Sequence, residues 1–149
     1  MDYISRLNAQ KKILDVLFDD RRTYSRRYRK GGWTGKEILI HLKDAETVFY
    51  DRIRRVISEE NPILWYFEED KWARRLDYKR QDIALAKKLF MATREAIAEI
   101  ATAHLRAYGT KQGIHSRYGL MDMRELMRRM IVHTDKHIGH LRAITSKIR

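Results

Sequence analysis

The chain has 149 residues, of which 44% are hydrophobic and 35% are charged, and its formal net charge is +12. This length suffices for one well-buried domain and is short for two, so we treat residues 1–149 as a single domain. The absence of cysteine excludes a disulfide framework, a thiol nucleophile and a cysteine-ligated zinc site. Any metal must therefore be bound by imidazole and oxygen.

Neither a membrane segment nor a targeting segment is recognisable. No stretch approaches the ~20 consecutive apolar residues of a transmembrane helix. The N-terminal residues lack the basic and then apolar layout of a signal peptide. We therefore expect a cytoplasmic protein without a transmembrane segment.

The positive charge is concentrated in two segments. Residues 21–30 carry six basic side chains and no acidic one, namely Arg21, Arg22, Arg26, Arg27, Arg29 and Lys30. Residues 124–149 carry seven basic and two acidic side chains, which gives a net charge of +5. Two such basic faces could bind nucleic acid, an anionic membrane surface or an acidic substrate.

The spacing of apolar residues is helical along the whole chain. It predicts a first helix from about Asp2 to Asp19. After the basic segment, Thr34 and Glu37 form a capping box that begins a second helix. The buried face of this helix runs from Ile38 to Val56, and His41 lies at the edge of that face.

The second half of the chain predicts two more helices, and the length of the connector before them predicts the directions in which the helices run. Pro62 ends the second helix, and an aromatic-rich connector covers residues 59–79. A third helix is predicted over about residues 80–106, and a fourth runs from Met123 to near the C-terminus. Four helices around one core predict an all-α four-helix bundle. Because antiparallel neighbours need only a short loop, we expect the connector to cross the bundle, leaving helices two and three parallel and helices two and four antiparallel.

Three of the six histidines lie within the segment HTDKHIGHL. His133, His137 and His140 are spaced i, i+4 and i+7 and share one stripe of the fourth helix. His41 lies about 10 Å from the start of the second helix and His137 about 15 Å from the end of the fourth. In an antiparallel pair, His41, His133 and His137 could therefore meet around one ion, as zinc requires. The alternative is that they are ordinary helix histidines, hydrogen-bonded or solvated at the edge of the bundle.

The two histidine segments resemble a known family. The segment GGWTGKEILIHLKDAE is similar to the one that opens the second helix in the DinB/YfiT-like superfamily. The segment HTDKHIGHLRAI resembles that family's terminal-helix pattern, H-x-x-x-H-h-G-Q-[LI]. Weaker similarities lie between them, among them a loop with Gly113, His115 and Gly119. The likeness covers nearly the whole chain in order, and only the two histidine segments are specific.

The resemblance implies a four-helix bundle with a divalent ion, usually nickel or zinc, bound by His41, His133 and His137. It also implies hydrolase-like chemistry or transfer of a low-molecular-weight thiol, with a small-molecule substrate and a homodimer. His140 stands where the family usually has glutamine. It could be a hydrogen-bonding core residue, a fourth ligand, or a group that orients a ligand or acts as an acid or base.

Other polar and aromatic side chains have plainer interpretations. Asp44 could orient His41, although Asp44 and Glu46 fit solvated helix charges better. His104 and His115 are expected at the surface. The connector aromatics would cover the bundle or a dimer interface, or line a substrate mouth; they are Trp65, Tyr66, Phe67 and Trp72.

Two other functions compete with a metal-dependent enzyme. The basic segment interleaves Tyr24 and Tyr28 with arginines, which suits phosphate contacts and base stacking in a nucleic-acid-binding protein. No recognition-helix motif accompanies it. A stress-response protein whose metal is structural or absent is the remaining alternative.

Overall fold

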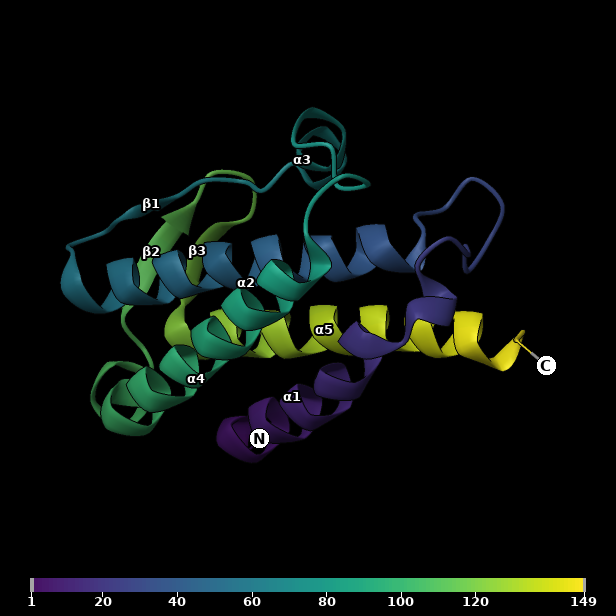
Figure 1. Ribbon diagram of the computed structural model, residues 1–149. Helices are drawn as coiled ribbons and strands as arrows, with labels where there is room; N and C mark the ends of the chain where they lie inside the picture. The colour runs from purple at the N-terminus through teal and green to yellow at the C-terminus, as the bar shows by residue number, and fades with distance from the viewer. Residues whose placement is uncertain (1, 149) are drawn as a thin grey trace.

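A computed structural model describes residues 2–148 and shows a bundle of four long helices (Figure 1). They are α1 (Tyr3–Asp19), α2 (Gly35–Ser58), α4 (Ile83–Tyr108) and α5 (Met123–Ser146). Helices α2 and α4 run in one direction and α1 and α5 in the other, so the predicted bundle with its long crossover is confirmed. No helix within residues 2–148 is both long and apolar enough to cross a membrane.

Each long helix begins at a side chain that caps it. Asp2, Thr34, Asp82 and Asp122 each accept a hydrogen bond from the backbone N–H three residues later. At Thr34 the bond is reciprocal, because the Glu37 carboxylate accepts from the Thr34 backbone N–H at 2.8 Å. A cap of this kind contributes about 1 kcal/mol to stability. Asp82 also explains why α4 begins slightly later than the predicted residue 80.

All three connections between the long helices contain structure that the helical periodicity did not predict. The connector between α2 and α4 includes β1 (Ile63–Leu64) and α3 (Glu69–Arg75), and the basic segment includes a short 3₁₀ turn, η1 (Arg21–Thr23). The loop between α4 and α5 is a hairpin of β2 (Gln112–His115) and β3 (Gly119–Asp122). Strand β1 pairs in parallel with β2, and β2 in antiparallel with β3. Strands this short contain too few alternations to be recognised by their period.

Two glycines make this small sheet possible. Gly119, with φ of +78°, adopts the left-handed conformation at the end of the hairpin loop, which glycine accommodates without strain. At Gly113, a Cβ atom would lie only 3.1 Å from the Leu64 side chain and from the Pro62 carbonyl oxygen. The sheet therefore draws the connector tightly against the hairpin.

One buried arginine links all four long helices. Arg94 of α4 lies 2.5 Å (Nε to Oε1) and 2.8 Å (Nη2 to Oε2) from the Glu46 carboxylate of α2. It also donates to Gln10 Oε1 of α1 at 2.8 Å and to Thr134 Oγ1 of α5 at 3.1 Å. Arg94 and Glu46 are at most 2% exposed, so the prediction that Glu46 is solvated is wrong. Burial raises the pKa of Glu46, and the Arg94 charge opposes that rise.

Replacing Arg94 by methionine should lower the free energy of unfolding by about 3–5 kcal/mol, because it leaves the Glu46 carboxylate buried without its cation. Urea denaturation followed by circular dichroism measures the loss. The double variant Arg94→Met with Glu46→Leu should recover most of it. The control is Lys11→Met, which removes the half-buried partner of the exposed Glu95 and should cost only about 0–1 kcal/mol. Equal losses for Arg94→Met and Lys11→Met would contradict this role of Arg94.

Candidate metal centre

Helices α2 and α5 bring three of the predicted histidines together. One ring nitrogen from each of His41, His133 and His137 lies within 4.8 Å of the other two. The ring centroids of the three pairs are 4.6 to 4.9 Å apart. His41 Nε2 lies 2.9 Å from His133 Nε2. Their antiparallel helices thus place the side chains at matching depths, as the rise per residue predicted.

Two of these imidazoles are buried, and three of their four ring nitrogens have no hydrogen-bond partner. His41 is 0% exposed and His137 is 3% exposed. Within residues 2–148, His41 Nδ1 and both ring nitrogens of His137 have no partner. The unpartnered ring of His137 thus differs from an ordinary hydrogen-bonded or solvated histidine, whereas His41 Nε2 is hydrogen-bonded to His133. Burial, followed by the neighbouring positive groups, lowers the pKa of His41 and of His137 well below the ordinary value. Both rings are consequently neutral at pH 7, the state that binds a metal.

Aromatic side chains surround the three imidazoles. The Phe67 ring stacks on His41 at a centroid distance of 5.6 Å, and Trp33 lies 4.8 Å from the same ring. Trp72 covers the outer side of Phe67 at 4.7 Å. Phe67 and Trp72 thus help to enclose the histidines, a role that the sequence analysis did not name.

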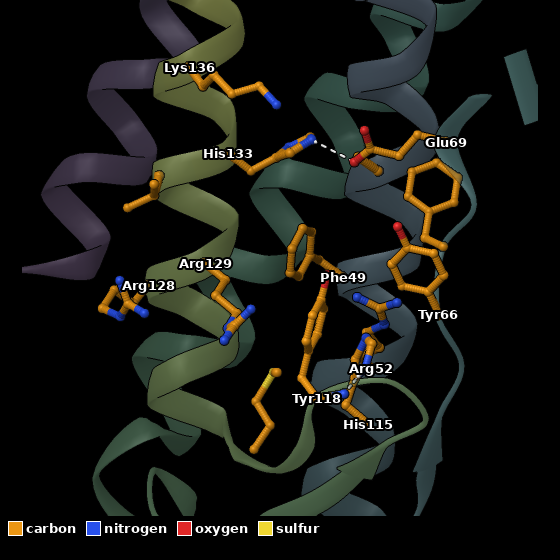
Figure 2. Close-up of a pocket in the computed structure, with 14 residues that line it drawn as sticks. Phe49, Arg52, Tyr66, Glu69, His115, Tyr118, Arg128, Arg129, His133 and Lys136 are labelled. Carbon is orange, nitrogen blue, oxygen red and sulfur yellow. Dashed lines mark hydrogen bonds and ion pairs between the residues drawn. The ribbon is translucent and has the colours of Figure 1, made fainter.

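A carboxylate from α3 completes the group. Glu69 Oε1 lies 3.3 Å from His133 Nε2 (Figure 2) and 3.8 Å from His41 Nε2. Sequence analysis did not find Glu69, because it lies in the connector and no spacing relates it to the histidines. Only the path of the connector back over α2 brings it to the site.

A cavity of about 470 Å³ opens beside His133 and Glu69. Figure 2 shows the aromatic rings of Phe49, Tyr66 and Tyr118 along its walls. Four cationic side chains also line it, namely Arg52, Arg128, Arg129 and Lys136. Its size is that of an ordinary small-molecule site.

His140 lies outside the cluster of three. Its ring stacks on Tyr28 at a centroid distance of 4.0 Å and meets the edge of His137 at 5.3 Å. Asp44 does not orient His41 and is not solvated, so both interpretations of it were wrong. Instead, the buried Asp44 carboxylate accepts a 2.6 Å hydrogen bond from the Tyr78 hydroxyl.

His115 is buried, so its expected surface position was wrong, whereas His104 is exposed as predicted. Exposed and buried residues alternate along β2, and this alternation places Gly113 and His115 on the buried side of the strand. His115 Nδ1 accepts hydrogen bonds from the backbone N–H groups of Arg117 and Tyr118, at 3.1 and 3.3 Å. The ring proton is therefore on Nε2.

The basic segment lies on the surface and its aromatic rings are engaged in packing. All six predicted nucleic-acid contacts are exposed: Arg21, Arg22, Arg26, Arg27, Arg29 and Lys30. The Tyr24 hydroxyl donates to the Phe18 carbonyl oxygen at 2.5 Å, and Tyr28 is stacked on His140. Neither tyrosine is therefore free to serve as a platform for a base, which weakens the nucleic-acid interpretation.

Comparisons with known proteins agree with the fold. A family model described as the DinB superfamily matches residues 10–141. A protein of Oceanobacillus iheyensis, provisionally named a metal-dependent hydrolase, is 41% identical over 51 residues, which are 34% of this chain and only 30% of that protein. A protein of Halalkalibacterium halodurans, also provisionally named a metal-dependent hydrolase, is 24% identical over 92% of this chain and 77% of its own.

A solved structure gives the same fold. YfiT from Bacillus subtilis is described as a probable metal-dependent hydrolase with an unusual four-helix bundle topology. It aligns with a TM-score of 0.88 at 19% sequence identity, covering 98% of this chain and 85% of that chain.

The stability of the protein should fall between pH 6.5 and pH 4 partly through His115. Burial, together with the charges of Arg52 and Arg129, lowers the pKa of His115 from 6.5 to about 4. As the pH falls below 6.5, the unfolded chain binds a proton that the folded chain does not, so the free energy of unfolding decreases. The variant His115→Asn keeps an acceptor for the two backbone N–H groups and does not titrate in this range.

Urea denaturation at pH 7.5 and pH 4.5 measures the effect. The wild type should lose about 2–3 kcal/mol more than His115→Asn between these conditions. The control, His104→Asn at an exposed position of α4, should lose as much as the wild type. An equal loss for the wild type and His115→Asn would show that His115 does not titrate differently in the folded state.

Proposed function

The chain belongs to the DinB superfamily, and from this premise we propose that it is a metal-dependent hydrolase of small molecules. In this proposal His41, His133 and His137 bind one divalent ion, zinc or nickel, and the adjoining cavity receives the substrate. The observation that carries the proposal is the meeting of three imidazoles, two of them buried and neutral with unpartnered nitrogens.

The residues present fit such an ion. Neutral imidazole nitrogens are preferred donors for zinc and nickel, and catalytic zinc commonly has three protein ligands and one open position. Within residues 2–148, His41 Nδ1 and both ring nitrogens of His137 lack a hydrogen-bond partner, and an ion would bind one nitrogen of each ring. When bound, the ion would supply a Lewis acid and a water of lowered pKa.

Glu69 is the proton acceptor in this proposal. It lines the cavity together with His133, and its Oε1 atom lies 3.3 Å from His133 Nε2. From there it can accept the proton of the attacking water and deliver it to the leaving group. The rings of Phe67 and Trp72 exclude bulk solvent on one side, which strengthens electrostatic interactions within the site.

Thiol transfer is a second reaction that this arrangement supports. An ion held by three neutral imidazoles carries its full positive charge and would stabilise a thiolate. The cavity has room for a second reactant beside His133. The low-molecular-weight thiol would then be a co-substrate in place of water.

Purified protein free of an affinity tag should contain about one divalent ion per chain. Replacing His41, His133 or His137 by alanine should remove that ion, because each leaves only two imidazoles. Plasma mass spectrometry measures the metal content. His104→Ala, at an exposed position of α4, should retain the full content. Metal retained in all three ligand variants would contradict the proposed site.

Replacing Glu69 by glutamine should separate catalysis from metal binding. The variant should keep its ion, because its three imidazoles remain, and lose about 100-fold or more in kcat/KM for p-nitrophenyl acetate. Glu68→Gln, a neighbouring exposed carboxylate, is the matched control and should retain activity. Full activity in Glu69→Gln would exclude Glu69 as the proton acceptor. Loss of the ion would instead indicate that Glu69 is a ligand.

A further inference from the structure

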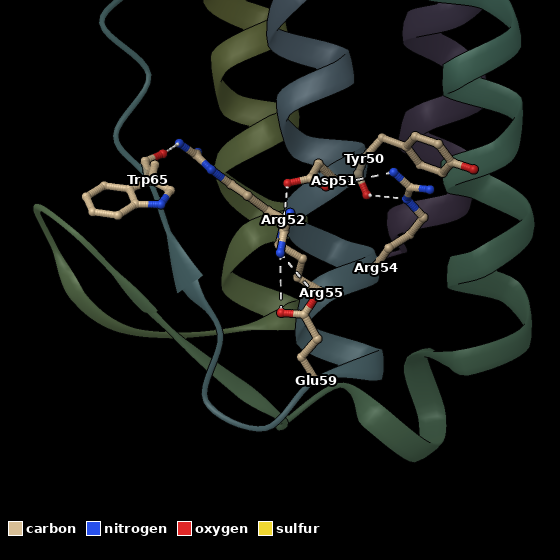
Figure 3. A network of polar contacts seen from close by, with 7 residues as sticks. All are labelled: Tyr50, Asp51, Arg52, Arg54, Arg55, Glu59 and Trp65. Atoms are coloured by element: carbon tan, nitrogen blue, oxygen red, sulfur yellow. Dashed lines mark hydrogen bonds and ion pairs between the residues drawn. The ribbon is translucent and has the colours of Figure 1, made fainter.

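The far end of the cavity contains a buried cation. Arg52 of α2 is only 8% exposed, and its guanidinium lies 5.6 Å from the centroid of the Phe49 ring. Its Nη2 donates to the Trp65 carbonyl oxygen at 2.5 Å, a contact drawn in Figure 3. Its Nε atom is buried and has no hydrogen-bond partner within residues 2–148.

No carboxylate in the described chain pairs with Arg52. The adjacent Asp51 pairs with Arg54 and Arg55, as Figure 3 shows. Glu59 pairs with Arg55 as well. Burying a charged group without a counter-ion is costly, and a guanidinium cannot escape that cost by losing its proton at pH 7. The site is therefore incomplete without an anion.

The surroundings of Arg52 favour an anion too. His115 lines the same cavity, and because its Nδ1 accepts two backbone hydrogen bonds, its Nε2–H remains as a donor. Arg128 and Arg129 share the single carboxylate of Glu125, outside the cavity lining. Glu69 is the one acidic side chain among the lining residues, and it lies at the histidine end.

We propose that this cavity binds a small organic carboxylate, with its carboxylate held by Arg52 and the His115 Nε2–H and its reacting end directed at His41, His133 and His137. This inference deepens the proposed function and rests on it. The planar guanidinium fork matches a carboxylate in two parallel hydrogen bonds. The rings of Phe49 and Tyr66, between the two ends, would contact the apolar body of the substrate.

The spacing along α2 sets the length of this substrate. Arg52 follows His41 by eleven residues, about 16 Å along the helix axis, and the long Arg52 side chain shortens the span because it leans back along α2 (Figure 3). A carboxylate attached directly to the reacting group would be too short to reach both. We therefore expect several bonds between the two ends of the substrate.

The test uses cobalt-loaded protein and two thiols of equal length, mercaptohexanoate and mercaptohexanol. Thiolate binding to cobalt changes the visible spectrum and reports on the metal site, while titration calorimetry gives each affinity. Wild-type protein should bind the carboxylate at least about tenfold more tightly than the alcohol. Arg52→Gln should abolish this preference and leave mercaptohexanol affinity unchanged. Arg52→Lys, which keeps the charge without the fork, should retain only part of it.

Arg54→Gln is the matched control. Arg54 lies on the same helix, is stacked on Tyr50 at 4.1 Å and does not line the cavity, so this variant should keep the full preference. Thermal melts establish that each variant is folded. Should Arg52→Gln fail to fold, Arg52→Lys serves in its place.

The outcomes separate the two proposals. If both thiols change the cobalt spectrum and bind wild-type protein equally, the metal site stands and the carboxylate site is overturned. If no cobalt binds, the proposed function fails, and the carboxylate site is then tested by calorimetry with hexanoate against hexanamide. A preference for hexanoate that Arg52→Gln removes would uphold it, and equal affinities would overturn it.

Discussion

The rest of this structure depends on the buried polar contacts of the Arg94 guanidinium. It contacts Glu46 of α2, Gln10 of α1 and Thr134 of α5, and it therefore fixes four helices at one register. Thr134 directly follows His133 in the chain, and Glu46 lies five residues after His41. A shift of α5 along α2 by one turn would break the polar contacts of Arg94. The same shift would separate His41 from His133 and His137. The register of the bundle and the geometry of the site are thus set by the same buried contacts.

Buried groups with unsatisfied atoms lie near both ends of one cavity. Beside the end that His133 lines, the buried rings of His41 and His137 have unpartnered nitrogens; at the other end, Arg52 has a charge that an anion would satisfy. Natural proteins rarely leave buried polar atoms unpaired, so each end points to a ligand. A substrate that carries a carboxylate and reacts at a metal would satisfy both at once. The aromatic walls between them exclude water and leave the charged groups to act at the ends.

Much of the fold and the histidine cluster could be predicted from the sequence. The capping box at Thr34 locates the start of the second helix, and the length of the connector gives the directions of the helices, from which the meeting of His41 with α5 follows. Glu69, Arg52 and the inward position of His115 could not be predicted. Their places depend on a strand pairing of only a few residues, between β1 and β2. Glu46 and Asp44 look like surface charges in sequence, because their partners Arg94 and Tyr78 are distant in the chain.

The most direct test of this account is anomalous X-ray diffraction, at the zinc edge, from crystals of the protein grown with zinc. The account predicts one strong peak bounded by the ring nitrogens of His41, His133 and His137, about 2.0–2.1 Å from each. Zinc found only on surface side chains, with these three rings hydrogen-bonded to one another or to water, would contradict it. The histidines would then be packed polar residues of the bundle.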